Sequence, residues 1–289
     1  MAETTYHQKP VDELTFTDDG MFQAVLRNKE ICAELVERLL HIKVGHIEYP
    51  ELEKPIKPFY TTKGVRLDVY LKDEDKIIDV EMQSSPQEAL GKRTRYYQSM
   101  IDMDSLMKGQ DYTELKESYV LFICKNDPFF KDNEKKNPYG LPCYTFQNVC
   151  KENAIVNLND KSLKVIYNAS AYSQEKDEKI KAFLHYISTN EPGEDDFSNR
   201  LSDLVEIIKD NEIFRSDYAA MNLHDRDIMR LAKKEGREEG LKDGAFQKAI
   251  ETAANMLNDK IPVENIARYV DLPLEKVQEL ADKLDINEN

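Results

Sequence analysis

Four polar side chains recur at alternate positions in the stretch GVRLDVYLKDEDKIIDVEMQS, residues 64–84: Asp68, Asp79, Glu81 and Gln83. Apolar residues occupy the positions between them, on either side of a charged turn. A period of two sends alternate side chains to opposite faces of a β-strand, so the pattern predicts a hairpin with an apolar face and a polar face. Carboxylates gathered on one face are costly unless they are paired, hydrated or bound to a metal ion.

A hairpin with a solvated outer face has the same pattern, so the pattern alone leaves both interpretations open. Asp79 shares a face with Glu81, but we expect it to cap a turn or to pair with a basic neighbour. The sequence contains no motif for a zinc site, for nucleoside triphosphate hydrolysis or for a serine nucleophile. The five histidines form no HExxH or Cys/His pattern, and neither a GxxxxGK[ST] loop nor a GxSxG elbow is present.

The composition describes a polar chain of 289 residues, with 40% hydrophobic and 33% charged residues and a formal net charge of −15. This charge repels nucleic acid at long range, so DNA binding would need local basic clusters or divalent cations. The four cysteines form no CxxC pair, which favours free thiols in a reducing compartment. With neither a secretory signal pattern nor an apolar run near the roughly 20 residues that span a bilayer, we expect a cytoplasmic protein without a membrane partner.

The surrounding pattern predicts the elements that must position these side chains. An apolar stripe predicts one helix from Asp18 through Leu40, ended by Gly45, and a second helix covers residues 86–108. The apolar run at residues 118–124 predicts a strand buried on both faces, and residues 163–167 predict a further strand. The first half therefore predicts an α/β fold, a mixed sheet flanked by helices.

The second half is helical in pattern from Asp177 almost to the end, with the break EPGEDD at residues 191–196. A Glu-Gly or Asp-Gly pair recurs every four residues from Glu235 to Gly244 and predicts a helical connector. Residues 245–284 have the outline of three short helices resembling a helix-turn-helix. Residues 225–289 hold 11 Lys and Arg against 15 Asp and Glu, so we expect this tail to mediate interaction or homo-oligomerisation rather than to read DNA.

The hairpin LDVYLKDEDKIIDVEMQS, followed by RTRYYQSM and KGQDYTELKESYVLFI, resembles the Rpn family of recombination-promoting nucleases and transposase-like proteins, within the PD-(D/E)XK nuclease superfamily. The resemblance extends upstream to DDGMFQAVL, where Gln23 stands in place of a Lys that the family tends to show. It also includes the Glu-Gly repeat and the tail IARYVDLPLEKVQEL, and so spans most of the chain. It implies a restriction-endonuclease-like fold.

The resemblance also implies roles for the hairpin residues. Asp68 matches the first motif aspartate, and Glu81-Met82-Gln83 matches a second motif written E-x-Q, where the wider superfamily usually has Lys at the last position. The implied cofactor is Mg²⁺, with Mn²⁺ or Ca²⁺ as alternatives, held by Asp68, Glu81 and the carbonyl of Met82, while Gln83 orients the attacking water. A third carboxylate is left open among three candidates on the first helical stretch: Asp19, Glu30 and Glu34.

Three side chains on the following helix, Arg93, Tyr97 and Gln98, are candidates for substrate binding. Arg93 and Tyr97 are four residues apart and share a helix face. With the resemblance, they are expected to contact a phosphate or to support the carboxylates; the alternative is a surface arginine beside a core tyrosine. Lys92 and Arg95 add positive charge nearby.

The sequence therefore predicts a nuclease-like domain at residues 1–190 and a helical region at residues 191–289. The expected activity is Mg²⁺-dependent endonucleolytic hydrolysis of DNA, with a role in recombination, mobile DNA or phage defence implied by the resemblance. The alternatives are a nuclease-fold protein that binds nucleic acid or a partner without cutting, and a scaffold that acts through its helical tail.

Overall fold

The computed structural model describes residues 9–45, 51–56, 65–85, 88–220, 244 and 246–287. The chain divides into two compact units, Met1–Tyr218 and Ala219–Asn289. The Glu-Gly pairs at residues 235–236 and 239–240 lie outside the described residues.

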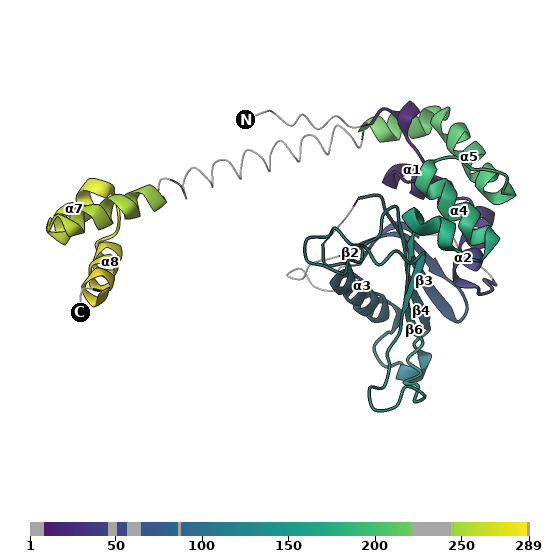
Figure 1. Ribbon diagram of the computed structural model, residues 1–289, viewed down its shortest axis with the longest axis horizontal. Coiled ribbons are helices and arrows are strands. Elements are labelled where there is room, and N and C mark those ends of the chain that lie inside the picture. Colours follow the sequence, from purple (N-terminus) through teal and green to yellow (C-terminus); the bar gives the residue numbers. More distant parts are fainter. Residues whose placement is uncertain are drawn as a thin grey trace. The chain divides into compact units, whose positions relative to one another are not determined.

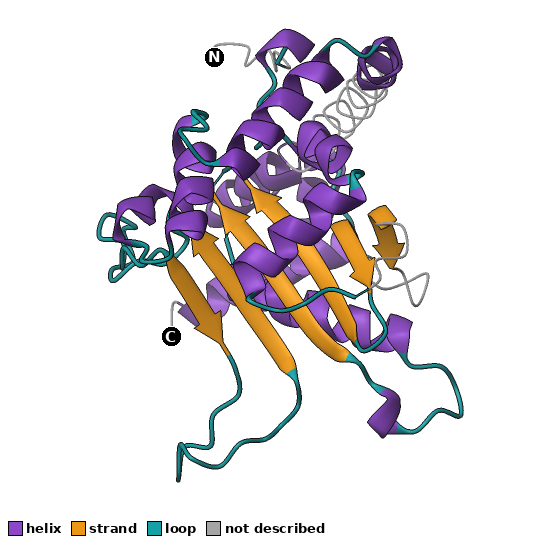
Figure 2. Ribbon diagram, turned by 90° about the vertical axis from the view of Figure 1, so that its right-hand side faces the viewer, coloured by secondary structure: helices purple, strands orange, loops and turns teal. Residues whose placement is uncertain are grey.

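Within the described residues, the first unit contains a six-stranded mixed sheet in the order β1-β2-β3-β4-β6-β5 (Figure 2). Strands β2 and β3 form the predicted antiparallel hairpin, and β3, β4 and β6 run parallel. Strands β1 and β5 pair antiparallel at the two edges. The strands are β1 (Glu51–Ile56), β2 (Val65–Lys72), β3 (Lys76–Gln83), β4 (Glu117–Cys124), β5 (Cys143–Phe146) and β6 (Ser162–Asn168).

Helices cover both faces of this sheet, as the predicted fold class requires (Figure 1). The helix α3 packs on one face through Leu90, Met100 and Ile101. The opposite face carries Ile78, Val80 and Met82 of β3 into the larger core cluster, which also holds side chains from α1, α2, α4 and α5. The helices of this unit include α1 (Asp19–Leu26), α2 (Lys29–Leu40), α3 (Leu90–Ser105), α4 (Glu178–Thr189) and α5 (Asp196–Lys209), with the short 3-10 helices η1 (Val11–Glu13), η2 (Tyr112–Glu114) and η3 (Ala169–Gln174). Residues 212–220 are also helical.

The first helical stretch is two helices, and the prediction of one continuous helix was wrong. Asn28 interrupts it, because its side chain accepts hydrogen bonds from the backbone N–H groups of Glu30 and Ile31 and so caps α2. The end expected at Gly45 comes earlier, at Leu40, where His41 adopts a left-handed conformation.

The first compact unit continues beyond residue 190, where the sequence placed a domain boundary. Phe197 and Leu201 of α5 are buried in the larger core cluster. Arg38 of α2 donates to the Asp195 carboxylate at 2.9 Å and to the carbonyl of Lys179 at 3.0 Å, which ties α5 to α2 and α4. We therefore propose a boundary near residue 218, because α5 shares its core with the sheet.

The second unit is helical, as predicted. Residues 246–258 form a helix, followed by α7 (Val263–Val270) and α8 (Leu274–Asn287). Ala253, Ile266, Leu272 and Val277 form its own buried cluster. Among the described residues, no helix is both long and apolar enough to cross a membrane.

Candidate active site

The hairpin opens at the position of Asp68. The regular pairing of β2 with β3 ends at Val69↔Val80. Beyond it, the Asp68 backbone N–H donates to Glu81 Oε1 at 2.9 Å, and the Met82 backbone N–H donates to Asp68 Oδ2 at 3.3 Å. Backbone N–H groups need acceptors when they are buried, and here carboxylates take that role in place of carbonyls. The two carboxylates are thus held between the strands by the strands themselves.

The polar face of β3 is buried, which excludes the solvated hairpin. Asp79, Glu81 and Gln83 are only 0%, 3% and 5% exposed. Burial, followed by repulsion from Asp19, raises the pKa of Asp68 to about 6. Burial, followed by repulsion from Asp68, raises the pKa of Glu81 to about 8. The site concentrates carboxylates in a region of low dielectric, where their repulsion is poorly screened.

Asp79 contradicts the expectation that it would cap a turn or pair with a basic residue. Among the residues that the structure describes, neither of its buried carboxylate oxygens has a hydrogen-bond partner. Burial, then repulsion from Glu81 and from Asp68, raises the pKa of Asp79 well above its usual value. Asp79 lies opposite Tyr70 in the neighbouring strand, and the positive charge of Arg93 offsets only part of the rise in its pKa.

Arg93 of α3 connects the two ends of the E-x-Q motif. Its Nη1 donates to Gln83 Oε1 at 3.0 Å, and its Nη2 lies 3.3 Å from Glu81 Oε2. The same Nη2 donates to the Tyr97 hydroxyl at 3.1 Å, one helical turn away. The guanidinium lies 5.1 Å from the ring centroid of Phe122 in β4. Arg93 therefore orients Gln83 and Glu81 and offsets part of their negative charge.

The structure brings most of the predicted site residues together, but not Gln98. Its amide nitrogen donates to Ser118 Oγ at 2.6 Å and to Asp102 Oδ1 at 3.0 Å. Ser118 pairs with Ile77, near the opposite end of β3 from Gln83. Gln98 therefore braces α3 against the start of β4, away from the carboxylates.

The structure distinguishes the three candidates for a third carboxylate. Asp19, at the start of α1, raises the pKa values of both Asp68 and Glu81 by repulsion. Glu34 instead pairs with Arg38 and Arg200. Glu30 is exposed in the first turn of α2 and is not a main cause of the raised pKa of Asp68 or of Glu81.

The donor set fits a small divalent cation that keeps several water ligands. In the part of the chain that the structure describes, no three His, Cys, Asp or Glu side chains converge as a metal cluster. Mg²⁺ needs only one or two protein carboxylates and takes its other ligands from water and phosphate oxygens. The raised pKa values of Asp68 and Glu81 and the unpartnered oxygens of Asp79 indicate an excess of negative charge that a cation would offset.

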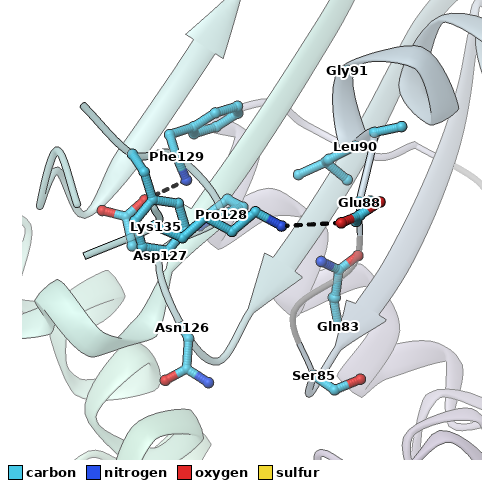
Figure 3. Close-up of a pocket in the computed structure, with 12 residues that line it drawn as sticks. Gln83, Ser85, Glu88, Leu90, Gly91, Asn126, Asp127, Pro128, Phe129 and Lys135 are labelled. Carbon is cyan, nitrogen blue, oxygen red and sulfur yellow. Dashed lines mark hydrogen bonds and ion pairs between the residues drawn. The ribbon is translucent and has the colours of Figure 1, made fainter. Parts of the chain in front are cut away.

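A pocket beside the motif was not predicted from the sequence. It has a volume of about 550 Å³ and begins at Gln83, with walls from the loop after β4 and from the start of α3 (Figure 3). The signal that could have found it is the parallel arrangement of β3 and β4, because ligands bind beyond the carboxyl ends of such strands.

The mixed sheet flanked by helices agrees with the predicted restriction-endonuclease-like α/β fold. Residues 20–142 match the family model described as PD-(D/E)XK nuclease family transposase. This match confirms the predicted resemblance and covers α1 to β4, including every residue of the E-x-Q motif. Comparisons with the curated proteins and with the solved structures gave no match.

Proposed function

We propose that the protein is a metal-dependent DNA endonuclease that hydrolyses phosphodiester bonds. The observation that carries the proposal is the pair Asp68 and Glu81, held between two opened strands, with pKa values raised by burial and by repulsion from neighbouring carboxylates. A bound Mg²⁺ supplies charge neutralisation at the scissile phosphate and lowers the pKa of a coordinated water. Asp68, Glu81 and the Met82 carbonyl would hold it, with Asp19 acting through a water as the third carboxylate.

Gln83 and Arg93 prepare the site for the nucleophile and the phosphate. Arg93 occupies one lone pair of Gln83 Oε1, so the other lone pair remains for a hydrogen bond from the attacking water. The Gln83 side chain cannot take up a proton, so its role is orientation. Arg93 Nη2 donates a hydrogen bond to a phosphate oxygen of the substrate in place of its bond to the Glu81 carboxylate. The exposed Lys92 and Arg95 add positive charge on the same helix.

The test is nicking of supercoiled plasmid in Mg²⁺, Mn²⁺ or Ca²⁺ by the full chain and two isosteric variants. Asp68→Asn and Glu81→Gln keep the shape of the site and remove one negative charge each. We expect each to lower the rate at least about a hundredfold, since even weaker perturbations of metal sites cost 10–100-fold. Asp196→Asn, an exposed carboxylate in the first turn of α5, is the matched control and is expected to retain full activity. Wild-type cleavage that survives both site variants would refute the assignment.

A second candidate function is binding of nucleic acid or a protein partner without cleavage. Gln83 favours it, because the superfamily usually has a Lys at this position and an amide carries no charge. The net charge of −15 also disfavours strong DNA binding. Absence of nicking by the wild type in all three cations, together with retained DNA or partner binding, would support this alternative.

The proposed nuclease also has a proposed biological role and a proposed homo-oligomeric assembly. The family description names transposases, which supports a role with mobile DNA or recombination, and phage defence is an alternative. We propose that the second unit mediates homo-oligomerisation in a cytoplasmic protein. Its described helices carry Tyr269 and Leu274 at 60% and 48% exposure, which supports a further contact surface.

A further inference from the structure

The pocket next to Gln83 lies where the nuclease site meets the end of the sheet. Gln83 pairs with Cys124 across parallel strands, so the residues that follow each strand leave the sheet at the same edge. Asn126 to Phe130 follow β4, and Leu90 and Gly91 begin α3. The pocket volume of about 550 Å³ is within the range of small-molecule sites.

Gln83 belongs to both the site and the pocket. Its oxygen accepts from Arg93, and no acceptor for its amide nitrogen is present among the described residues. Figure 3 shows this nitrogen turned toward the side of the pocket formed by Pro128 and Lys135. Gln83 is only 5% exposed, and its amide nitrogen does not belong to the fully buried unpartnered atoms of the described residues, so a ligand in the pocket can accept a hydrogen bond from it.

The loop wall is held in place by a buried carboxylate. Asp127 accepts from the Phe129 backbone N–H at 2.9 Å, from the Gly140 backbone N–H at 2.7 Å and from the Tyr144 hydroxyl at 2.7 Å. The Phe129 ring packs on Tyr144 with centroids 4.7 Å apart. These contacts hold the loop that forms the apolar wall of the pocket.

The mouth of the pocket carries features that suit a phosphate. The helix α3 is 16 residues long, and no side chain caps its N-terminus. The partial positive charge at a helix N-terminus attracts anions. Lys135 lies at the same edge, 3.5 Å from the exposed Glu88 carboxylate.

We propose that this pocket binds one nucleotide of the DNA strand next to the scissile phosphate, with its base unstacked. The base lies against the apolar wall of Pro128, Phe129 and Phe130, and Gln83 donates a hydrogen bond to its polar edge. Its phosphate lies at the start of α3. Flat apolar walls with a few polar groups are the usual means of holding an unstacked base. This proposal rests on the proposed nuclease function for its substrate class.

The first test measures binding of single deoxynucleoside monophosphates to the full chain in EDTA, by calorimetry. Gly91→Phe adds a large side chain at the lining of the pocket, where a Cβ meets no atom within 4 Å. We expect at least one of dAMP, dGMP, dCMP and TMP to bind the wild type and to bind Gly91→Phe at least tenfold more weakly. Phe130→Ala, which removes part of the wall, provides a second variant if Gly91→Phe does not fold. Tyr139→Ala, an exposed aromatic residue of the same loop outside the pocket lining, is the matched control and is expected to bind normally.

Three results would overturn the proposal: no monophosphate binds, the folded pocket variants bind as tightly as the wild type, or inorganic phosphate binds as well as the nucleotides. The last result would indicate an anion site without base recognition. Because the measurement needs neither metal nor cleavage, it succeeds or fails independently of the plasmid assay.

The second test uses duplexes in which 2-aminopurine replaces each adenine in turn, bound to Asp68→Asn in Mg²⁺. Unstacking increases 2-aminopurine fluorescence, and we expect an increase at one position next to the cleavage site. Addition of Gly91→Phe is expected to abolish it. Unchanged fluorescence at every position, in a complex shown to form, would refute base unstacking.

Discussion

Glu81→Gln should stabilise the folded protein at alkaline pH, although we expect it to inactivate the enzyme. Burial and the Asp68 carboxylate raise the pKa of Glu81 from 4.5 to about 8, and the side chain is only 4% exposed. A folded-state pKa above the unfolded value means that the contribution to stability is complete below about pH 4.5. It is lost as the pH rises through about 8.

The magnitude follows from the shift and from the contacts that the variant weakens. A rise from 4.5 to about 8 corresponds to roughly 5 kcal/mol of disfavoured ionisation at pH 9. The variant also loses the charge in its bonds from Arg93 Nη2 and the Asp68 backbone N–H, each costing about 1.5 kcal/mol. We therefore expect Glu81→Gln to be about 2 kcal/mol more stable than the wild type at pH 9, without an advantage at pH 5.

The assay is urea unfolding at pH 5 and pH 9 in EDTA, followed by far-UV circular dichroism because the chain contains no tryptophan. Asp196→Asn controls for the loss of a carboxylate at an exposed position, and its effect should be the same at both pH values within error. A variant that is no more stable than the wild type at pH 9, or that differs from it equally at both pH values, would refute this account of the buried carboxylates.

Three further predictions concern the metal, the core and the two units. Mg²⁺ should raise the Tm of the wild type at pH 8 but not that of Asp68→Asn. At a concentration one hundred times the dissociation constant, Mg²⁺ binding stabilises the folded state by about 2.7 kcal/mol. An equal shift of Tm in both proteins would argue against the metal site. Arg38→Ala should cost about 3 kcal/mol in urea unfolding, because its side chain is 7% exposed and leaves the Asp195 carboxylate unpaired. Arg200→Ala, at 41% exposure, should cost less than about 1 kcal/mol, and similar losses for both variants would contradict the reasoning. A chain of residues 1–218 should unfold cooperatively by itself, as measured by circular dichroism. The reason is that the buried cluster of the second unit contains no residue of the first unit. A non-cooperative transition would show that the units depend on each other.

The hairpin and its neighbours were predictable because their signals are local. Alternation of apolar and polar residues identified β2 and β3, and a continuous apolar run identified β4. The edge strands β1 and β5 have weaker sequence signals. β1 contains Pro55, which is tolerated at a sheet edge but is not typical of a strand, and β5 has only four residues. The split between α1 and α2 depends on one capping side chain, Asn28, within an otherwise continuous apolar stripe.

The sequence by itself determined which residues are the candidates for the proposed chemistry, because Asp68, Glu81 and Gln83 lie in one short hairpin and share one pattern. Only the tertiary structure decided how deeply the polar face of the hairpin is buried and which partners its side chains have. The packing of α3 buries Asp79 without a partner, commits Arg93 to Glu81 and Gln83, and directs Gln98 to Ser118 instead of the site. The pocket likewise exists only because parallel pairing brings the loop after β4 to the end of β3. These features depend on contacts between distant parts of the chain, whose register and burial no local period encodes.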